Sequence, residues 1–364
     1  MKNKFKKIKQ FYTRHKKIIS TTLRIVISAG LIAYLIFFRS GLKDFGTFKD
    51  ILSTASVPLL LASASLHFVG LYTSALRWQI LLRTQGIRLS IGFLSSSFMI
   101  GSFFNNLLPT SIGGDIFRSV DIANRAKVSV GKSASIIVIE RFSGVLTAAV
   151  YGVIALLLGF RKVGTTSYII PVSVFFAICI ILAFLIFNPS ILRLNRLVEK
   201  IKFLSKIRGK LKEVYHIFLN FKKFRLAIFE VLICGFAVQI IVIANYYLAA
   251  RALGIGLSFA AFIFIVPIVY TIAMLPISIG GTGVRENSLV FLMVALGAAK
   301  DLSTVASLLL FAMILGFGLL GGIVYIVRPF ILKQPKITET GLDAQKTANA
   351  TEVSGIKNSE ENKD

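Results

Sequence analysis

The sequence predicts an all-α polytopic membrane protein, with about six full transmembrane helices and two re-entrant broken-helix hairpins in an inverted repeat. Hydrophobic residues make up 55% of the 364 residues and charged residues only 16%, whereas soluble domains contain roughly 25% charged residues. Long apolar runs adjoin basic segments, and two other apolar stretches end in glycine-rich breaks of similar sequence. This composition excludes a soluble globular enzyme, because one core could not bury so much apolar surface.

Six apolar runs are long enough to cross the roughly 30 Å hydrocarbon layer of a bilayer. The first run has a basic flank like that of a signal peptide. It is too long for the apolar region of such a peptide, and no A-x-A cleavage site follows, so we predict an uncleaved helix. The six predicted spans are Ile18–Phe38, Val57–Leu76, Ser133–Phe160, Tyr168–Phe187, Leu226–Ala250 and Ser303–Val327.

The positive charge predicts the topology. The chain has 42 Lys and Arg against 16 Asp and Glu, a formal balance of +26. In a soluble protein this balance would suggest nucleic acid. Here the basic clusters adjoin apolar runs, so we expect cytoplasmic loops at anionic lipid headgroups of the plasma membrane and no nucleic-acid partner. The predicted cytoplasmic segments are 1–17, 77–90, 118–132, 190–225 and 328–364, which places both termini inside.

The predicted domain organisation is a basic N-terminus, one membrane domain and a polar tail. The tail has no apolar periodicity and is expected to be disordered. The boundaries are 1–17 for the N-terminus, 18–332 for the membrane domain with a basic cytoplasmic segment at 190–225, and 333–364 for the tail.

Two further apolar stretches, 91–108 and 259–276, each lead into a glycine-rich break. The charges place residues on both sides of the first stretch in the cytoplasm and residues on both sides of the second outside. Each stretch would then enter and leave the membrane from one face. If both stretches crossed the membrane completely, both termini would still lie on the same side, so full spans remain an alternative.

The two breaks share one pattern. Residues 108–118 and 275–285 align without gaps, and both read L-P-x-S-I-G-G-x-x-x-R. We predict an inverted repeat with halves at about 57–160 and 226–327, in which the broken segments meet near the midplane, where transporters commonly bind substrate. The alternative is a pair of flexible hinges.

The chemistry of the repeat suits an anion. Prolines stop the incoming half-helix, serines are suited to cap the outgoing one, and glycines allow backbone N–H groups to approach a ligand. Arg118 and Arg285 are expected about two turns into the outgoing half-helix, where they could grip a phosphate. Alternatively, Glu140 and Glu286 only neutralise these arginines and hold the hairpins. The candidate substrate-binding residues are Asn105, Asn106, Ser111, Gly113, Gly114, Arg118, Glu140, Arg141, Ser278, Gly280, Gly281, Arg285 and Glu286.

Signals of an enzyme are missing from the sequence. It contains no G-x-S-x-G, H-E-x-x-H or P-loop motif and no Asp-rich pair suited to Mg²⁺. Cys179 and Cys234 lie in apolar runs and are expected to pack as small apolar groups. We therefore expect no catalytic residues, no metal and no cofactor.

The chain resembles the lysylphosphatidylglycerol synthase transmembrane-region family, the flippase-like module that also occurs as a standalone membrane protein. The resemblance covers about residues 18–330. It rests on Arg77-Trp78 with Leu81-Leu82, Phe104-Asn105-Asn106-Leu107-Leu108-Pro109 with the following Gly-Gly and Arg118, Glu140-Arg141 with Gly144, and Pro276-x-Ser278-Ile279-Gly280-Gly281-x-Gly283-x-Arg285-Glu286.

In the full-length synthases, a cytoplasmic domain transfers lysine from charged tRNA to phosphatidylglycerol. Only the tail follows residue 332 here, so the resemblance implies lipid translocation rather than aminoacyl transfer. The expected substrate is an anionic or aminoacylated phospholipid or a polyprenyl-phosphate lipid. The alternatives are an integral membrane enzyme of lipid or glycolipid synthesis, or a non-catalytic subunit. Expected partners are membrane lipids with anionic headgroups and a separately encoded lipid-modifying enzyme.

Overall fold

The computed structural model describes residues 22, 26–36, 45–108, 113–157, 224–273 and 278–331. The chain divides into two compact units, Met1–Gly322 and Ile323–Asp364, and the second is described only over its first residues, which are helical. The predictions for the N-terminus, the span Tyr168–Phe187 and the tail fall outside the described residues, as do nearly all of the basic segment 190–225 and part of the first span.

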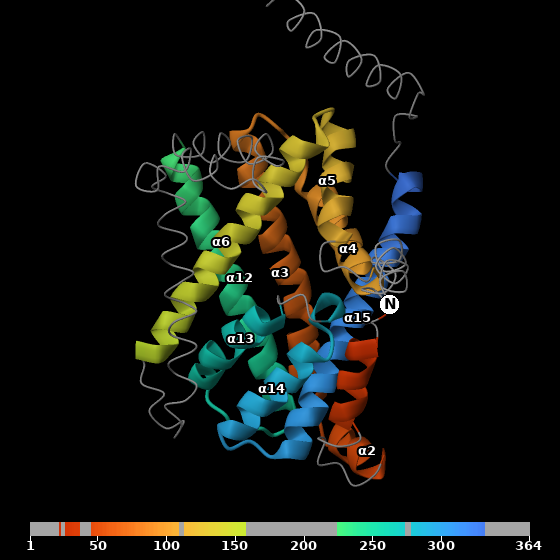
Figure 1. The fold of residues 1–364 in the computed structure, drawn as a ribbon, viewed down its shortest axis with the longest axis vertical. Helices are drawn as coiled ribbons and strands as arrows, with labels where there is room; N and C mark the ends of the chain where they lie inside the picture. The colour runs from red at the N-terminus through yellow and green to blue at the C-terminus, as the bar shows by residue number, and fades with distance from the viewer. Residues whose placement is uncertain are drawn as a thin grey trace, which may run out of the picture. The chain divides into compact units, whose positions relative to one another are not determined.

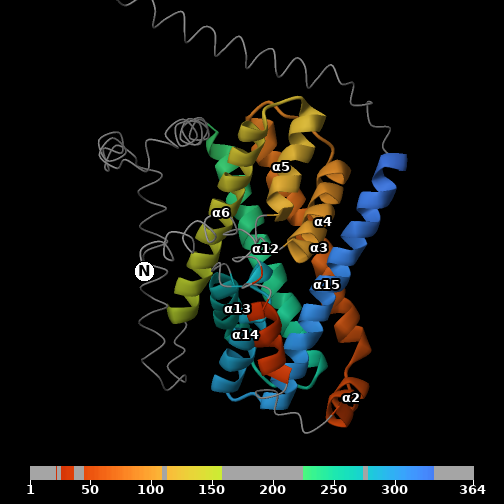
Figure 2. The same cartoon turned by 45° about the vertical axis from the view of Figure 1, so that its right-hand side comes forward.

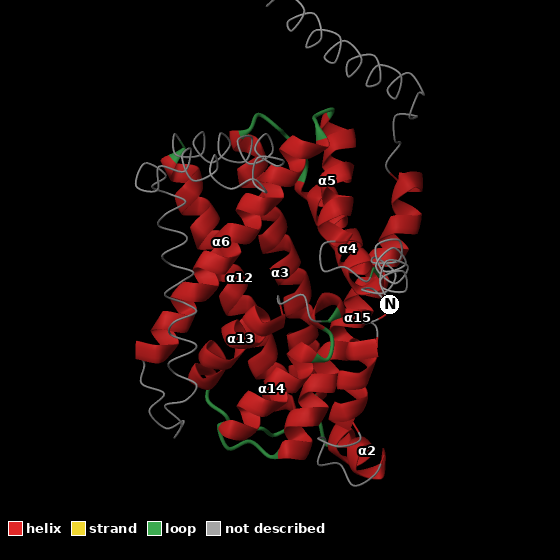
Figure 3. Cartoon of the chain, in the orientation of Figure 1, coloured by secondary structure: helices red, strands yellow, loops and turns green. Residues whose placement is uncertain are grey.

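All regular secondary structure in the described ranges is helical (Figure 3). Residues 26–34 form part of the predicted first helix. The other elements are α2 (Phe45–Ser53), α3 (Val57–Thr84), α4 (Ile91–Leu107), α5 (Gly113–Ala126), α6 (Val130–Leu157), α12 (Arg225–Ala252), α13 (Phe259–Ala273), the 3₁₀ turn η2 (Ile279–Gly281), α14 (Val284–Ala295) and α15 (Lys300–Ile331).

Four of the described helices are long and apolar enough to cross a membrane, namely α3, α6, α12 and α15. They correspond to the second, third, fifth and last predicted spans, so the sequence located these four correctly. One boundary differs by about two helical turns. The second span was predicted to end at Leu76, but α3 continues to Thr84 and carries Arg77 inside the helix, where it is buried. Ion pairing compensates the charge of Arg77, as described below.

The helices α3 and α12 pack against each other in antiparallel orientation. The Ser56 N–H at the start of α3 donates to the Ala252 carbonyl at the end of α12 (2.8 Å). Farther along, the Ser63 hydroxyl donates to the Asn245 carbonyl (3.0 Å), and the Asn245 amide donates to the Ser63 carbonyl. Farther along α3, a Cβ atom at Gly70 would lie 3.4 Å from the Ile241 side chain of α12, so the two helices stay close there. This pair forms the scaffold on which the shorter helices lie.

The helices α4 and α5 form one close hairpin. A side chain at Gly114 would collide with the carbonyl of Gly101, so these glycines let the two backbones touch. At the open end of the hairpin, the Arg125 guanidinium in the last turn of α5 lies 5.7 Å from the Phe93 ring in the first turn of α4. The start of α4 and the end of α5 therefore lie on the same side of the unit Met1–Gly322.

The helices α13 and α14 form a second hairpin, which packs through apolar side chains that include Phe262, Val269, Leu289 and Met293. The α4–α5 pair lies in the upper half of Figures 1 and 2 and the α13–α14 pair in the lower half. The turn η2 contacts α4, and a Cβ atom at Gly280 would lie 3.4 Å from the Asn105 carbonyl oxygen. The second glycine-rich break thus reaches the end of the helix that precedes the first break.

The helix α15 packs closely on α4 through its glycines. A Cβ atom at Gly322 would lie 2.9 Å from the Phe103 ring, and one at Gly318 would collide with the Asn106 amide. Gly316, in contrast, has open space beside it.

Candidate functional site

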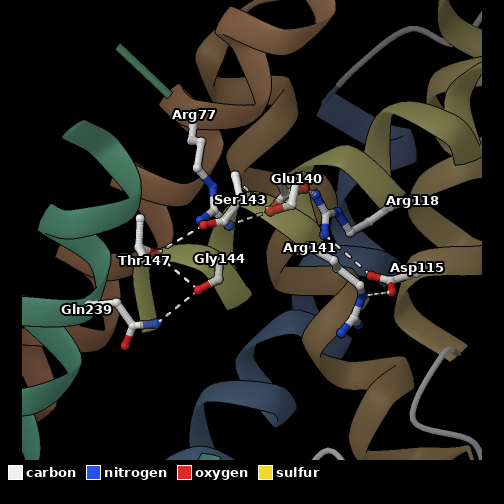
Figure 4. Close-up of polar contacts among 9 residues, drawn as sticks. All are labelled: Arg77, Asp115, Arg118, Glu140, Arg141, Ser143, Gly144, Thr147 and Gln239. Atoms are coloured by element: carbon white, nitrogen blue, oxygen red, sulfur yellow. Dashed lines mark hydrogen bonds and ion pairs between the residues drawn. The ribbon is translucent and has the colours of Figure 1, made fainter. Parts of the chain in front are cut away.

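A cluster of charged side chains joins α3, α5 and α6 (Figure 4). Its centre is Glu140 on α6. The Arg77 Nη2 atom on α3 donates to Glu140 Oε1 at 3.0 Å, and the Arg118 Nη2 atom on α5 donates to Glu140 Oε2. One carboxylate therefore holds two guanidinium groups from two other helices.

A second carboxylate extends the cluster. The Arg118 Nη1 atom lies 3.5 Å from Asp115 Oδ1, and the Arg141 Nε atom donates to Asp115 Oδ2. Glu140 and Arg141 are adjacent in sequence but bind different partners, as expected for neighbours that point to different sides of a helix. Three arginines face two acids, so the cluster carries one excess positive charge.

Arg118 also lies between aromatic rings. Its guanidinium carbon lies 4.0 Å from the centroid of the Trp78 ring and 3.5 Å from that of Phe98. These two rings meet edge to face, with 5.3 Å between their centroids. A flat, delocalised cation suits this position, because it can stack and donate to carboxylates in its own plane at the same time.

The members of the cluster differ sharply in exposure. The side chains of Arg77, Arg118, Asp115 and Glu140 are at most 10% exposed, whereas the Arg141 side chain is 46% exposed. Arg141 also lies well inside a candidate span, as the twelfth of the 28 residues of α6. A cation at that depth is costly unless it faces protein or a watery cavity. Arg141 is thus the part of the cluster that another molecule can reach.

The start of α5 is shaped by the α4–α5 contact. The Asn105 side-chain oxygen accepts a hydrogen bond from the Gly114 N–H (2.8 Å), and Asp115 lies in the first turn of α5. An acid in the first turn is favoured by the helix dipole. The protein's own oxygen atoms therefore occupy positions beside the Gly-Gly pair at which the sequence predicted a bound anion.

Hydrogen bonds along α6 link the cluster to α12. The Thr147 hydroxyl donates to the Gly144 carbonyl (3.0 Å), and the Gln239 amide of α12 donates to the same oxygen (3.4 Å; Figure 4). A Cβ atom at Gly144 would lie 3.5 Å from the Arg77 Nη1 atom, which is an ordinary contact distance, so this part of α6 lies against the Arg77 side chain.

The second break differs from the first. Gly280, Gly281 and Gly283 have φ angles of 56°, 79° and 82°, and α14 begins only at Val284. Glu286 accepts a hydrogen bond from the Gly283 N–H (2.6 Å). The predictions that Ser278 caps the outgoing helix and that Arg285 lies two turns inside it were therefore wrong.

Ser278 does not cap α14, because left-handed glycines separate it from the helix, and Gly283 takes the cap position. Arg285 is the second residue of α14 rather than lying two turns inside it. Its Nε and Nη2 atoms donate to Glu286 Oε1 at 2.9 and 2.6 Å. The ion pair that the sequence offered as an alternative to phosphate binding is thus present, as is the pair between Arg118 and Glu140.

The first helix contacts this second break. The Asn287 amide donates to the Leu31 carbonyl at 2.9 Å, and a side chain at Gly283 would meet Leu31 and the Ser28 carbonyl. The lack of a side chain at Gly283 therefore serves both the turn and this contact.

Several candidate residues lie apart from the charged cluster. The Asn106 amide donates to the Ile314 carbonyl of α15 (3.2 Å). Ser278 is buried, and its hydroxyl has no hydrogen-bond partner among the residues that the structure describes. Ser111 is outside the described residues. Among the residues that are described, no three His, Cys, Asp or Glu side chains gather to hold a metal ion.

The candidates predicted from the sequence did not include Arg77, Trp78, Phe98 or Asp115. A signal was available for two of them, because a basic residue beside the chain's one tryptophan follows an apolar run at Arg77-Trp78. Asp115 stands inside the repeated pattern, where the second copy has Thr282. Nothing in the local sequence singles out Phe98.

Comparison with known proteins agrees with this architecture. The chain is similar to a UPF0104 membrane protein of Pyrococcus horikoshii, with 23% identity over 307 residues that cover 79% of this chain and 90% of the relative. The sequence characteristic of the lysylphosphatidylglycerol synthase TM region matches residues 22–322, which include the four candidate spans up to the last turns of α15, both hairpins and the charged cluster. The chain therefore belongs to the lysylphosphatidylglycerol synthase transmembrane-region family.

Proposed function

We propose that this protein is a lipid translocator of the plasma membrane, which moves an anionic or aminoacylated phospholipid or a polyprenyl-phosphate lipid between leaflets. The observation that carries the proposal is Arg141. It is a half-exposed cation well inside a candidate span, attached to a cluster in which the described residues carry an excess positive charge. All three lipid classes share a phosphate, and a guanidinium group can bind phosphate oxygens through two parallel hydrogen bonds.

The arrangement of the hairpins supports a path through the membrane. We propose that α4–α5 and α13–α14 are re-entrant hairpins that enter from opposite faces as an inverted repeat. The helices α4 and α13 contain 17 and 15 residues, which corresponds to roughly 25 Å and 22 Å, less than the hydrocarbon thickness. The contact of η2 with α4 brings the second break to the end of the first incoming helix.

The geometry suggests separate roles for the three arginines. Arg77 and Arg118 both bind Glu140, and Arg118 also lies between two aromatic rings, which supports a structural role that fixes α5 against α3 and α6. Arg141 has one carboxylate partner, Asp115. An arriving phosphate can therefore bind the free face of Arg141 or replace Asp115. We place the phosphate contact of the transported lipid at Arg141 rather than at Arg118.

Translocation can be measured with the purified protein in vesicles that contain phosphatidylglycerol with a fluorophore on its acyl chain. A membrane-impermeant reductant bleaches only the outer leaflet, so further bleaching reports flipping. We expect Arg141→Gln to slow flipping about 10- to 100-fold, the range that corresponds to the loss of a charged hydrogen bond. Arg141→Lys should retain part of the rate, because it keeps the charge but loses the planar fork.

The matched control is Arg251→Gln, which removes an exposed arginine at the end of α12 and should leave the rate unchanged. Wild-type flipping by Arg141→Gln would overturn the assignment of the phosphate contact. Lipid extracts of a deletion strain test the wider proposal. A translocator changes which leaflet holds a lipid, an enzyme changes which lipids exist, and a subunit of a separately encoded lipid-modifying enzyme changes neither without its partner.

A further inference from the structure

The turn between α3 and α4 forms a hollow outside the charged cluster. Its volume is about 580 Å³, and it is lined by Arg83, Arg88, Leu89 and Ser90. Arg83 belongs to the last turn of α3, and Ser90 is the N-cap of α4. Arg83 follows Arg77 by six residues on α3, which is roughly 9 Å along the helix axis. The hollow therefore lies toward the end of a candidate span rather than at its middle.

Hydrogen bonds fix the backbone of this turn. Gly86 has a φ angle of 78°, and its N–H donates to the Arg83 carbonyl at 3.0 Å, which is a common way to end a helix. The Gln79 side-chain amide donates to the Leu89 carbonyl at 2.8 Å. The arginines thus extend from a preformed backbone, which lowers the entropy cost of binding a ligand between them.

The charges at the hollow favour an anion. Arg83 and Arg88 are exposed, and neither forms an ion pair with any residue that the structure describes. The Lys132 ammonium donates to the Gln85 carbonyl of the same turn at 3.3 Å, which adds a third cation nearby. The start of α4 at Ser90 contributes the positive end of a helix dipole.

We propose that this hollow binds the phosphate of an anionic lipid headgroup, with Arg83 and Arg88 as its cationic contacts. The end of a spanning helix lies at the depth of lipid headgroups, and basic pockets between helices at the cytoplasmic face suit such headgroups. Leu89 supplies an apolar wall beside the cations. This site goes beyond the translocation proposal, because it uses no residue of the charged cluster.

The test is lipid binding to the purified full-length chain in neutral detergent, measured by native mass spectrometry. The probes are phosphatidylglycerol, zwitterionic phosphatidylcholine and inorganic phosphate. The wild type should bind phosphatidylglycerol most tightly. The double variant Arg83→Gln/Arg88→Gln should lose about 30-fold in affinity for it, which follows from about 1 kcal/mol for each basic residue near an anionic surface.

The matched control is Arg251→Gln/Lys300→Gln, which removes two exposed cations from helix ends away from this turn. The control should bind phosphatidylglycerol like the wild type. Equal losses in both double variants, or none in the Arg83/Arg88 variant, would overturn the site. Inorganic phosphate that binds as tightly as phosphatidylglycerol would assign the hollow to a soluble anion and overturn the lipid assignment. Either result leaves the translocation proposal standing, since Arg141 is unchanged.

Discussion

Glu140 is the residue on which the buried charges depend, because its two oxygens bind guanidinium groups from α3 and α5. Its side chain is 4% exposed, so water cannot replace it. A buried charge that loses its partner costs far more than a surface ion pair contributes. The stability of this region should therefore respond strongly to the charge of a single carboxyl group.

Glu140→Gln tests this dependence, since it keeps the shape of the side chain and removes its charge. We expect a loss of about 3–5 kcal/mol in the free energy of unfolding, because Arg77 and Arg118 stay buried with fewer negative charges. Thermal unfolding of the detergent-solubilised protein measures the loss. Adding Arg77→Gln should recover part of it, since the double variant removes one uncompensated cation. A single variant as stable as the wild type would contradict this account.

Arg118→Lys keeps the positive charge but removes the planar guanidinium group, so it tests the two contributions separately. Lysine cannot stack between Trp78 and Phe98 while it donates to both Glu140 and Asp115. We expect a loss of about 2–4 kcal/mol, which combines a desolvated cation–π contact with one charged hydrogen bond. The control, Arg125→Lys, changes an exposed arginine 5.7 Å from the Phe93 ring and should unfold at the wild-type temperature. Equal melting temperatures for both variants would show that charge alone matters at Arg118.

At the scale of secondary structure, the two copies of the repeated pattern adopt different local structures. The first copy continues from Gly-Gly directly into α5, whereas the second forms a 3₁₀ turn and begins α14 later. The residue aligned with Gly283 is Ile116, which a left-handed φ angle would strain. One glycine therefore delays the second helix and places Arg285 in its first turn.

The α4–α5 hairpin depends on the contact between Gly101 and Gly114. In Gly114→Ala, the methyl group would collide with the Gly101 carbonyl, so the helices must separate and the Asn105 hydrogen bond must break. We expect a loss of about 1–3 kcal/mol in stability from this overpacking. Gly92→Ala on the same hairpin has open space and should be neutral or slightly stabilising. Similar unfolding temperatures for both variants would exclude close packing at Gly114.

At the scale of the whole molecule, the described loops form two groups at opposite ends of α3. The loops between α3 and α4 and between α5 and α6 meet where Lys132 donates to the Gln85 carbonyl. The start of α3 meets the end of α12 through Ser56 and Ala252, at the other end of these helices. The first group carries Arg83, Arg88, Lys127 and Lys132. The topology predicted from charge therefore assigns the first group to the cytoplasm.

Cysteine labelling tests that assignment. In a chain whose Cys179 and Cys234 are replaced by serine, Ser129→Cys in the α5–α6 loop should resist an impermeant thiol reagent in intact cells. Ala299→Cys, in the loop before α15, should be labelled. Both positions are exposed, so a difference reports sidedness rather than burial, and permeabilised cells should label both. Labelling of Ser129→Cys in intact cells would overturn the topology.

The sequence by itself determined the membrane class, the four described spans and the two short apolar helices that end at breaks. These depend on hydropathy and on glycine and proline, which act over a few neighbouring residues. It also offered the pairing of Glu140 and Glu286 with Arg118 and Arg285 as one of two alternatives, and these pairs are present.

Only the tertiary structure decided that Arg77 lies inside α3, that Asp115 binds Arg141, and that Arg141 alone among the clustered arginines is half exposed. These contacts join residues 26 to 63 positions apart. Such contacts depend on how helices cross and where glycines let backbones touch. Hydropathy and local spacing do not encode that geometry.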